Sequence, residues 1–257
     1  VLRKAGLKVV EVDRPDRKTR RLKGKSDPID AYAAAVAVAS GRASGTPKSR
    51  TGVVEAVRAL RVPRRSAVKS RTQAVNQLHC LVATAPDPLR ARLRGLPSTE
   101  LVTTCAAFRV PDTDDTLPAV TRLALRDLAR PIQPLDQQLA RTKPRLARIP
   151  TPPAPELLAR HGVGPDTAAT ILISAGDNPH RLRDERAFAA LAGASPVPAS
   201  SGKTTRHRLN RGGDRQLNAA LWRIAIVRLA THPDTRAYLE RRTNQGKTKT
   251  ETIRCLK

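Results

Sequence analysis

The sequence predicts a mainly α-helical protein that begins with a short α/β segment and contains one small hairpin. Three observations support this fold class. Apolar residues recur at mixed spacings of three and four over residues 51–108, which is typical of packed helices. Residues 8–12 fit a short strand. Residues 197–209, "VPASSGKTTRHRL", are too polar for a core strand and fit a hairpin or an exposed loop.

We expect the first region to span residues 1–46. The opening "VLRKAGLKVVEVD" fits the last turn of a helix, a stop at Gly6 and a strand from Lys8 to Val12. A lone strand needs neighbours in a sheet, and nothing later in the chain clearly supplies them. A basic link then leads into a helix that carries Asp27 and Asp30.

A helical or coiled-coil region is expected over residues 51–148. Pro63 should break or kink its first helix, because proline removes a hydrogen bond and clashes with the preceding turn. The many prolines of residues 109–155 predict short helices and a loose linker near residues 149–155. The apolar positions of the first helix are Val54, Val57, Val68, Val75, Leu78 and Val82.

The third region, residues 156–257, opens with "LLARHGVGPDTAATILISAGD". A helix should end at Gly162, and Pro165 suits the first position of the next helix. This is a helix-hairpin-helix pattern, in which Gly162 and Gly164 would place backbone N–H groups against a DNA phosphate. From the spacing alone, a helical hairpin with a glycine cap is the simpler interpretation.

Ser200 and Ser201 are candidate nucleophiles on the predicted hairpin. Cations can stabilise the charge that develops when a serine attacks a phosphodiester. Without other support, a serine-glycine turn on a solvated loop explains the same residues. After the turn "NRGGDR", an apolar stripe predicts a helix, in which we expect Trp222 to be buried. The neighbouring basic residues are Lys203, Arg206, His207, Arg208 and Arg211, and the stripe comprises Leu217, Leu221 and Ile224.

Asp27 and Asp30 allow two interpretations. Asp27 suits a helix N-cap, Pro28 suits the first helical position, and Asp30 lies where the helix dipole favours a negative charge. That account needs no function. Alternatively, residues three apart face the same way, and two such carboxylates can hold Mg²⁺ together with a phosphate.

Composition points to a polyanionic partner. Lys and Arg number 48 against 22 Asp and Glu, which gives a net charge of +26. Aromatic residues make up only 2%, which disfavours a base-stacking platform. The longest apolar run, residues 31–39, is too short to span a bilayer. With no signal peptide visible, we expect a cytoplasmic protein. The isolated cysteines and scattered histidines show no metal-ligand spacing.

Five motifs, in order, resemble the DEDD-type insertion-sequence transposases of the IS110 group. They are "KSDPIDA", "VEAVRALRVPRRSAVKSRTQAVNQL", "GVGPDTAAT", "FAALAGASPVPASSGK" and "RLNRGGDRQLNAAL", and they span nearly the whole chain. The resemblance implies a RuvC-like domain with four acids, a helical coiled-coil region and a C-terminal domain with a catalytic serine. It also implies DNA recombination, a guide RNA and a homo-oligomer.

Carried over by motif, Asp27 and Asp30 match the last two acids, as ligands of Mg²⁺, and Ser201 matches the nucleophile, with Ser200 as the near alternative. The first two acids of the family would precede Val1. We therefore expect an N-terminally truncated RuvC-like remnant with half of the metal site, which leaves the activity of this chain open. The competing interpretation is a non-catalytic, basic helical protein that binds nucleic acid. A repair-type helix-hairpin-helix nuclease is supported only by "GVGPDTAAT".

Overall fold

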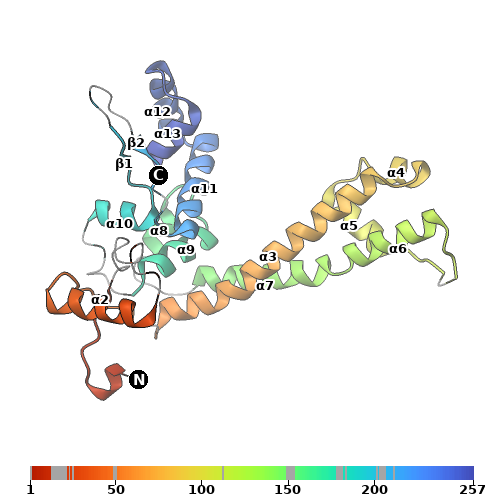
Figure 1. Ribbon diagram of the computed structural model, residues 1–257. Coiled ribbons are helices and arrows are strands. Elements are labelled where there is room, and N and C mark those ends of the chain that lie inside the picture. Colours follow the sequence, from red (N-terminus) through yellow and green to blue (C-terminus); the bar gives the residue numbers. More distant parts are fainter. Residues whose placement is uncertain are drawn as a thin grey trace. The chain divides into compact units, whose positions relative to one another are not determined.

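The structure is a computed structural model that describes residues 2–12, 22, 24, 26–48, 51–111, 113–148, 154–177, 182, 184–200, 202, 207–210 and 212–257. The chain divides into two compact units. Unit 1 comprises Val1–Glu55 and Thr151–Lys257, and unit 2 comprises Ala56–Pro150. Helices dominate both units, and the described residues form one small sheet, a hairpin (Figure 1), which confirms the predicted mainly α-helical class with a small hairpin. None of the helices in the described residues has the length and apolar character needed to cross a membrane.

Unit 2 is a helical hairpin closed at one end by shorter helices. Its long helix α3 (Val53–Ala83) starts within unit 1, and α7 (Ile132–Arg148) lies beside it (Figure 1). Between them the chain forms three shorter helices. These are α4 (Asp87–Leu93), α5 (Ser98–Ala106) and α6 (Leu117–Ala129).

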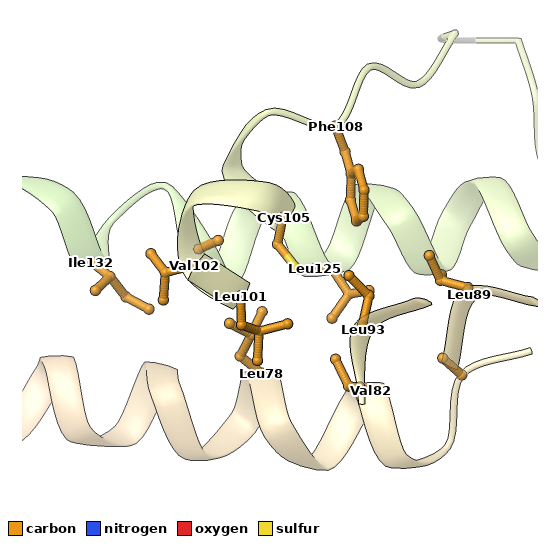
Figure 2. Close-up of a cluster of buried hydrophobic side chains, with 12 residues drawn as sticks. Leu78, Val82, Leu89, Leu93, Leu101, Val102, Cys105, Phe108, Leu125 and Ile132 are labelled. Atoms are coloured by element: carbon orange, nitrogen blue, oxygen red, sulfur yellow. The ribbon is translucent and has the colours of Figure 1, made fainter. Parts of the chain in front are cut away.

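The apolar core of unit 2 lies where the C-terminal part of α3 meets the shorter helices. Figure 2 shows Leu78 of α3 facing Leu101 of α5, with Leu125 of α6 behind them. Leu78 and Leu125 are both fully buried. The mixed spacing in the sequence therefore marks the buried face of α3 correctly at Leu78 and at Val82, although Val68 is exposed.

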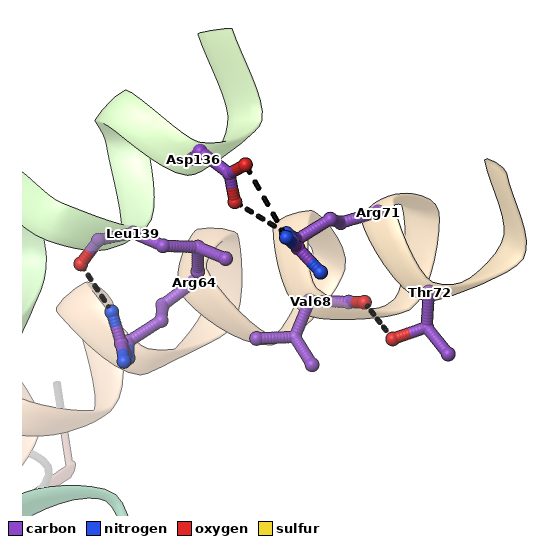
Figure 3. A network of polar contacts seen from close by, with 6 residues as sticks. All are labelled: Arg64, Val68, Arg71, Thr72, Asp136 and Leu139. Carbon is purple, nitrogen blue, oxygen red and sulfur yellow. Dashed lines mark hydrogen bonds and ion pairs between the residues drawn. The ribbon is translucent and has the colours of Figure 1, made fainter. Parts of the chain in front are cut away.

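Away from this core, arginines hold α3 against α7. Arg64 is 8% exposed and donates hydrogen bonds to the Leu139 carbonyl (2.6 Å) and the Thr142 hydroxyl (2.9 Å). About two helical turns further along α3, Arg71 forms a bidentate ion pair with Asp136 (Figure 3). These bonds add to apolar packing along this part of the helix pair, where Ala67 and Leu146 are buried.

The break predicted at Pro63 is not found, since α3 continues from Val53 to Ala83 with Pro63 inside it. Pro134 and Pro144 likewise lie within α7 without ending it. Pro63 and Ala59, whose carbonyl loses its usual partner, are both exposed, so water can satisfy that carbonyl. Burial of Arg64 next to the proline holds the helix in place.

Unit 1 begins with a single turn of 3-10 helix (Leu2–Ala5) and the helix α2 (Asp27–Ala39). The strand predicted from Lys8 to Val12 is wrong. Glu11 forms one isolated bridge with Gly45, and the described residues offer that segment no further strand partner. A strand requires a neighbour along its length, and here the neighbour meets it at one residue.

The rest of unit 1 is a helical domain with a hairpin. The α9–α11 pair forms its centre, and the buried Leu217 of α11 packs there with Leu221 and Ile224, as the apolar stripe predicted. Trp222 was predicted to be buried, but it is 47% exposed, because it lies off that stripe. The elements are α8 (Ala154–Ala159), α9 (Pro165–Ala175), α10 (Glu185–Ala192), β1 (Val197–Pro198), β2 (His207–Arg208), α11 (Arg215–Thr231), α12 (Pro233–Asn244) and α13 (Lys249–Leu256).

Replacing Pro63 with alanine should stabilise unit 2. A proline in a helix interior costs about 3 kcal/mol relative to alanine, so we expect a gain of about 1–3 kcal/mol in the free energy of unfolding. Urea denaturation followed by far-UV circular dichroism measures it. Ser66→Ala, an exposed change in the same helix, is the control and should shift the free energy by less than about 0.5 kcal/mol. Equal effects of the two changes would contradict the prediction.

Candidate functional site

The acid pair lies in the first turn of α2. Ser26 is the N-cap residue, so Asp27 stands one position later than predicted and does not cap the helix. Asp27 is exposed, whereas Asp30 is half-buried. Their spacing of three places both carboxylates along one side of the helix. The capping explanation for Asp27 is therefore wrong, while a favourable interaction of both acids with the helix dipole remains.

The chain that follows α2 turns back on itself. Ser40 caps the C-terminus, and its hydroxyl donates to the Val36 carbonyl at 2.7 Å. Gly41 adopts a φ of 70°, which favours glycine, and lets the chain reverse. Gly45 then accepts a hydrogen bond from the Glu11 amide at 2.7 Å. The acid helix is thus attached to a folded-back segment that continues to Lys48.

The serines belong to the loop of the predicted hairpin. Strands β1 and β2 are antiparallel, with Val197 opposite Arg208 and Pro198 opposite His207. Ser200 follows β1 and is exposed, and Arg208 is exposed on β2. The hairpin prediction is therefore confirmed, and it brings an exposed serine and an exposed cation to the same two-stranded element. Four predicted site residues lie outside the described residues: Ser201, Lys203, Arg206 and Arg211.

Two glycine turns meet at the base of the hairpin. Gly193 ends α10 in the left-handed conformation, with a φ of 64°. A Cβ added at Gly213 would collide with the backbone of Gly193, so only glycine fits at position 213. In addition, the Asp214 amide donates to the Leu191 carbonyl at 2.7 Å. These contacts fix where the hairpin leaves α10 and where it enters α11.

Asp214 is the N-cap of α11 and a hub of polar contacts. Its carboxylate accepts hydrogen bonds from the amides of Gln216 (2.7 Å) and Leu217 (3.2 Å) and from the Ser174 hydroxyl of α9 (2.6 Å). Burial acts to raise the pKa of Asp214, but these hydrogen bonds and the nearby charge of Lys48 outweigh burial and hold the pKa below its ordinary value. The carboxylate therefore stays ionised at neutral pH.

The turn between α8 and α9 matches the prediction at one boundary: α9 begins at Pro165 as expected, whereas α8 ends at Ala159 and not at Gly162. Gly162 adopts a φ of 85° and packs closely against α11, where a Cβ would approach the Ile224 carbonyl to 3.3 Å. The Gly164 amide already donates to the Thr167 hydroxyl at 3.0 Å, and the Val163 amide donates to the Arg160 carbonyl. Two amides of this turn are thus engaged within the protein. That geometry favours the glycine-capped hairpin over a phosphate clamp, and DNA contact by Gly162 and Gly164 stays a prediction.

The residues present fit a magnesium ion in ligand type. Asp27 and Asp30 offer carboxylate oxygens, and Mg²⁺ often rests on one or two carboxylates plus a phosphate. Within the described residues, no three His, Cys, Asp or Glu side chains gather into a group that could hold a metal by themselves.

The histidine rings of His161 and His232 lie 5.2 Å apart, a pair that the sequence did not predict, and each ring bonds to a threonine hydroxyl.

Sequence reasoning missed Lys48. Its ammonium donates to the Ile173 carbonyl of α9 at 2.6 Å, across 125 positions of sequence. No local pattern marks such a contact, because its two ends belong to different regions of the chain. By contrast, the role of Asp214 could have been found, since an aspartate directly before an apolar-stripe helix is an N-cap pattern.

Comparison with known families adds to this geometry. Unit 1 combines a helical domain, an exposed basic hairpin with a serine, and an acid-bearing helix. Residues 154–240, which include most of that helical domain, match the model of the transposase IS116/IS110/IS902 family. This part of the chain is therefore similar to the transposase domain of that family, in line with the resemblance in its motifs.

Two curated relatives support the match. A 43.6 kDa protein of insertion element IS110 from Streptomyces coelicolor is 34% identical over 103 residues, which are 40% of this chain and 25% of the relative. A 42 kDa protein of insertion element IS900 from Mycobacterium paratuberculosis is 30% identical over 101 residues, which are 39% of this chain and 25% of the relative. The matched part of the chain thus spans about a quarter of the length of either relative.

Asp214→Asn tests the electrostatic part of this site. Because the pKa of Asp214 is lowered in the folded state, its carboxylate contributes stability above the unfolded pKa of about 3.9. That contribution is lost as the pH falls through the lower folded pKa. We expect the variant to be less stable at pH 7, with the difference from wild type narrowing below about pH 4 in urea denaturation.

Ser174→Ala is the matched control for this measurement, since it keeps the carboxylate and removes one of its donors. Its stability at pH 7 should lie between those of the wild type and Asp214→Asn. A constant difference between wild type and Asp214→Asn from neutral pH down to about pH 3 would contradict the assigned direction of the pKa shift.

Proposed function

We propose that this chain is part of an insertion-sequence transposase that cuts and rejoins DNA through a serine nucleophile. The observation that carries the proposal is the match of residues 154–240 to a transposase family, which includes the hairpin with its serines. The net charge of +26 supports a nucleic-acid substrate. Assembly into a homo-oligomer and the use of a guide RNA rest on the family resemblance alone.

In the proposed reaction, the Ser201 hydroxyl attacks the phosphorus of a DNA phosphodiester. A bond forms between the serine oxygen and phosphorus, and the bond from phosphorus to one sugar oxygen breaks. The serine proton passes to solvent or a nearby base, and the released sugar hydroxyl takes up a proton. The covalent phosphoserine keeps the energy of the broken bond, so the hydroxyl of another strand can displace the serine and complete strand exchange.

Basic residues of the hairpin would stabilise the charge on the phosphoryl oxygens. Arg208, which is exposed on β2, is the described member of that group, with Lys203, Arg206 and Arg211 as further candidates. Asp27 and Asp30 would hold Mg²⁺, which when bound supplies further charge stabilisation at the phosphate. The acids and the hairpin belong to the same compact unit, in which α2 and the β1–β2 hairpin lie toward opposite ends (Figure 1).

Ser201→Ala should abolish covalent DNA adducts. The test incubates the full chain with duplex DNA that carries the ends of its insertion element, and it detects protein–DNA adducts on denaturing gels. Ser200→Ala is the matched control and should retain adducts, because its change lies one residue from the proposed nucleophile. Adducts that persist at the wild-type level in Ser201→Ala, or that disappear only in Ser200→Ala, would overturn the assignment.

Replacing both acids should lower the affinity of the protein for Mg²⁺. In the Asp27→Asn/Asp30→Asn variant, we expect the Mg²⁺ concentration for half-maximal adduct formation to rise by at least about tenfold, since even changes around metal ligands cost about 10- to 100-fold in affinity. Asp234→Asn is the control, because Asp234 is also an exposed aspartate in the first turn of a helix of unit 1. An identical Mg²⁺ titration for the double variant and the control would count against the metal site.

A further inference from the structure

We propose that Lys48 is a positioning residue, which docks the acid-bearing segment 27–48 onto the α9–α11 base of the serine hairpin. This inference rests on the proposed function, because it assigns to Lys48 the alignment of the two parts of that site. It concerns a residue that lies in none of the five motifs and that no local pattern in the sequence marks. Four features of the structure support this role.

First, the lysine makes a specific polar contact. The Lys48 ammonium donates to the Ile173 carbonyl at 2.6 Å, in the last turn of α9. A cation near the C-terminal end of a helix also interacts favourably with the helix dipole. The bond joins the segment that follows α2 in the sequence to helix α9, at the centre of the domain that matches the transposase family.

Second, the protein backbone is shaped to receive the lysine stem. Gly176, just after α9, adopts a φ of 84°. A Cβ at this position would approach the Lys48 Cγ and Cε atoms to 3.0 Å. The missing side chain of Gly176 therefore leaves the room in which the methylene stem lies, so the contact combines packing with a hydrogen bond.

Third, the docking point is joined to the hairpin base. Ser174, one residue after Ile173, donates to the Asp214 carboxylate at 2.6 Å. Asp214 caps α11, and Gly213 packs against Gly193. The positive charge of Lys48 also acts on Asp214. The Lys48 bond thus lies one residue from the polar cluster that sets the exit and entry points of the hairpin.

Fourth, the acid helix depends on such an attachment. Helix α2 has no fully buried residue, and apolar residues on its packed face, such as Ile29 and Val36, are only half-buried. The chain folds back after α2 through the Glu11–Gly45 bridge and reaches Lys48 three residues later. Loss of the Lys48 contact should therefore free the acids relative to the serine loop while both helical parts stay folded.

The test measures the distance between α2 and α11 by spin-label resonance in the full chain. Labels are attached to Tyr32→Cys and Trp222→Cys, both at exposed positions, after Cys80 and Cys255 have been replaced with serine. Cys105 can remain, because it is fully buried and burial raises its pKa to about 11, which suppresses the reactive thiolate.

Lys48→Met keeps the stem and removes the ammonium. We expect one narrow distance distribution in the labelled parent and a clearly broadened one in Lys48→Met, with Lys48→Arg restoring most of the narrow component. Lys8→Met removes the same charge from an exposed position of the N-terminal segment and should leave the distribution narrow. Far-UV circular dichroism confirms that each variant is folded, and if Lys48→Met does not fold, Lys48→Gln takes its place.

Adduct formation provides a second readout. With the native Tyr32 and Trp222, Lys48→Met should lower the rate of adduct formation by about 10- to 100-fold, as small misplacements of reacting groups do, with DNA affinity unchanged. A merely structural role would lower binding and rate together. An unchanged distance distribution in Lys48→Met, or a parent that is already broad, would overturn the inference. The distance needs no DNA, so failure of the parent to form adducts would defeat the proposed function and leave the docking result valid.

Discussion

The contact between the Gly193 turn and the Gly213 turn is the constraint on which the geometry of unit 1 depends. The backbones approach so closely that no side chain fits at position 213. Because one turn ends α10 and the other precedes α11, their contact fixes both ends of the hairpin. Asn218 reinforces it from α11 by donating to the Ala192 and Gly193 carbonyls at 2.8 and 3.3 Å. A loop held at both ends in this way can be exposed to solvent while its two ends keep fixed positions on the domain.

In unit 2, polar contacts help to hold helix α3 against helix α7. Its main apolar cluster lies at one end of the helix pair, and further along Arg64 and Arg71 add polar bonds between α3 and α7. Arginine can span the gap between two helices and satisfy a backbone carbonyl with its planar group, which an aliphatic side chain cannot do. The ion pair of Arg71 is partly exposed, so it fixes the register of the two helices more than it stabilises them.

Features that depend on neighbours in sequence could be predicted, and features that depend on distant contacts could not. The hairpin at Val197–Arg208, the start of α9 at Pro165 and the stripe led by Leu217 all follow from local pattern, and all are confirmed. Of the break or kink expected at Pro63, the break is not found, because α3 continues through the proline, where Ala59 is exposed and Arg64 bonds to α7. Burial of Trp222 could not be judged from residue type, because its place on the helix decides its exposure.

The residues of the motif "RLNRGGDRQLNAAL" can be explained largely by their structural roles. Most of its described polar and glycine residues have a packing or capping role. The Asn210 side chain accepts from the Gly212 amide, Gly213 meets Gly193, Asp214 caps α11, and Asn218 holds the α10 end. Such a motif can serve as a scaffold without touching a substrate.

The hairpin loop is different in this respect. Gly202 has a φ of 55° and open space around the position of a Cβ, and Ser200 and His207 are exposed. Packing therefore does not explain why this loop combines serine, glycine and basic residues, whereas attack on a phosphate would require an exposed hydroxyl among cations. The contacts that fold the domain lie at the base of the hairpin, whereas the described residues Ser200, Gly202 and His207 are exposed beyond that base. That division favours the serine loop over the glycine turns as the place for the proposed reaction.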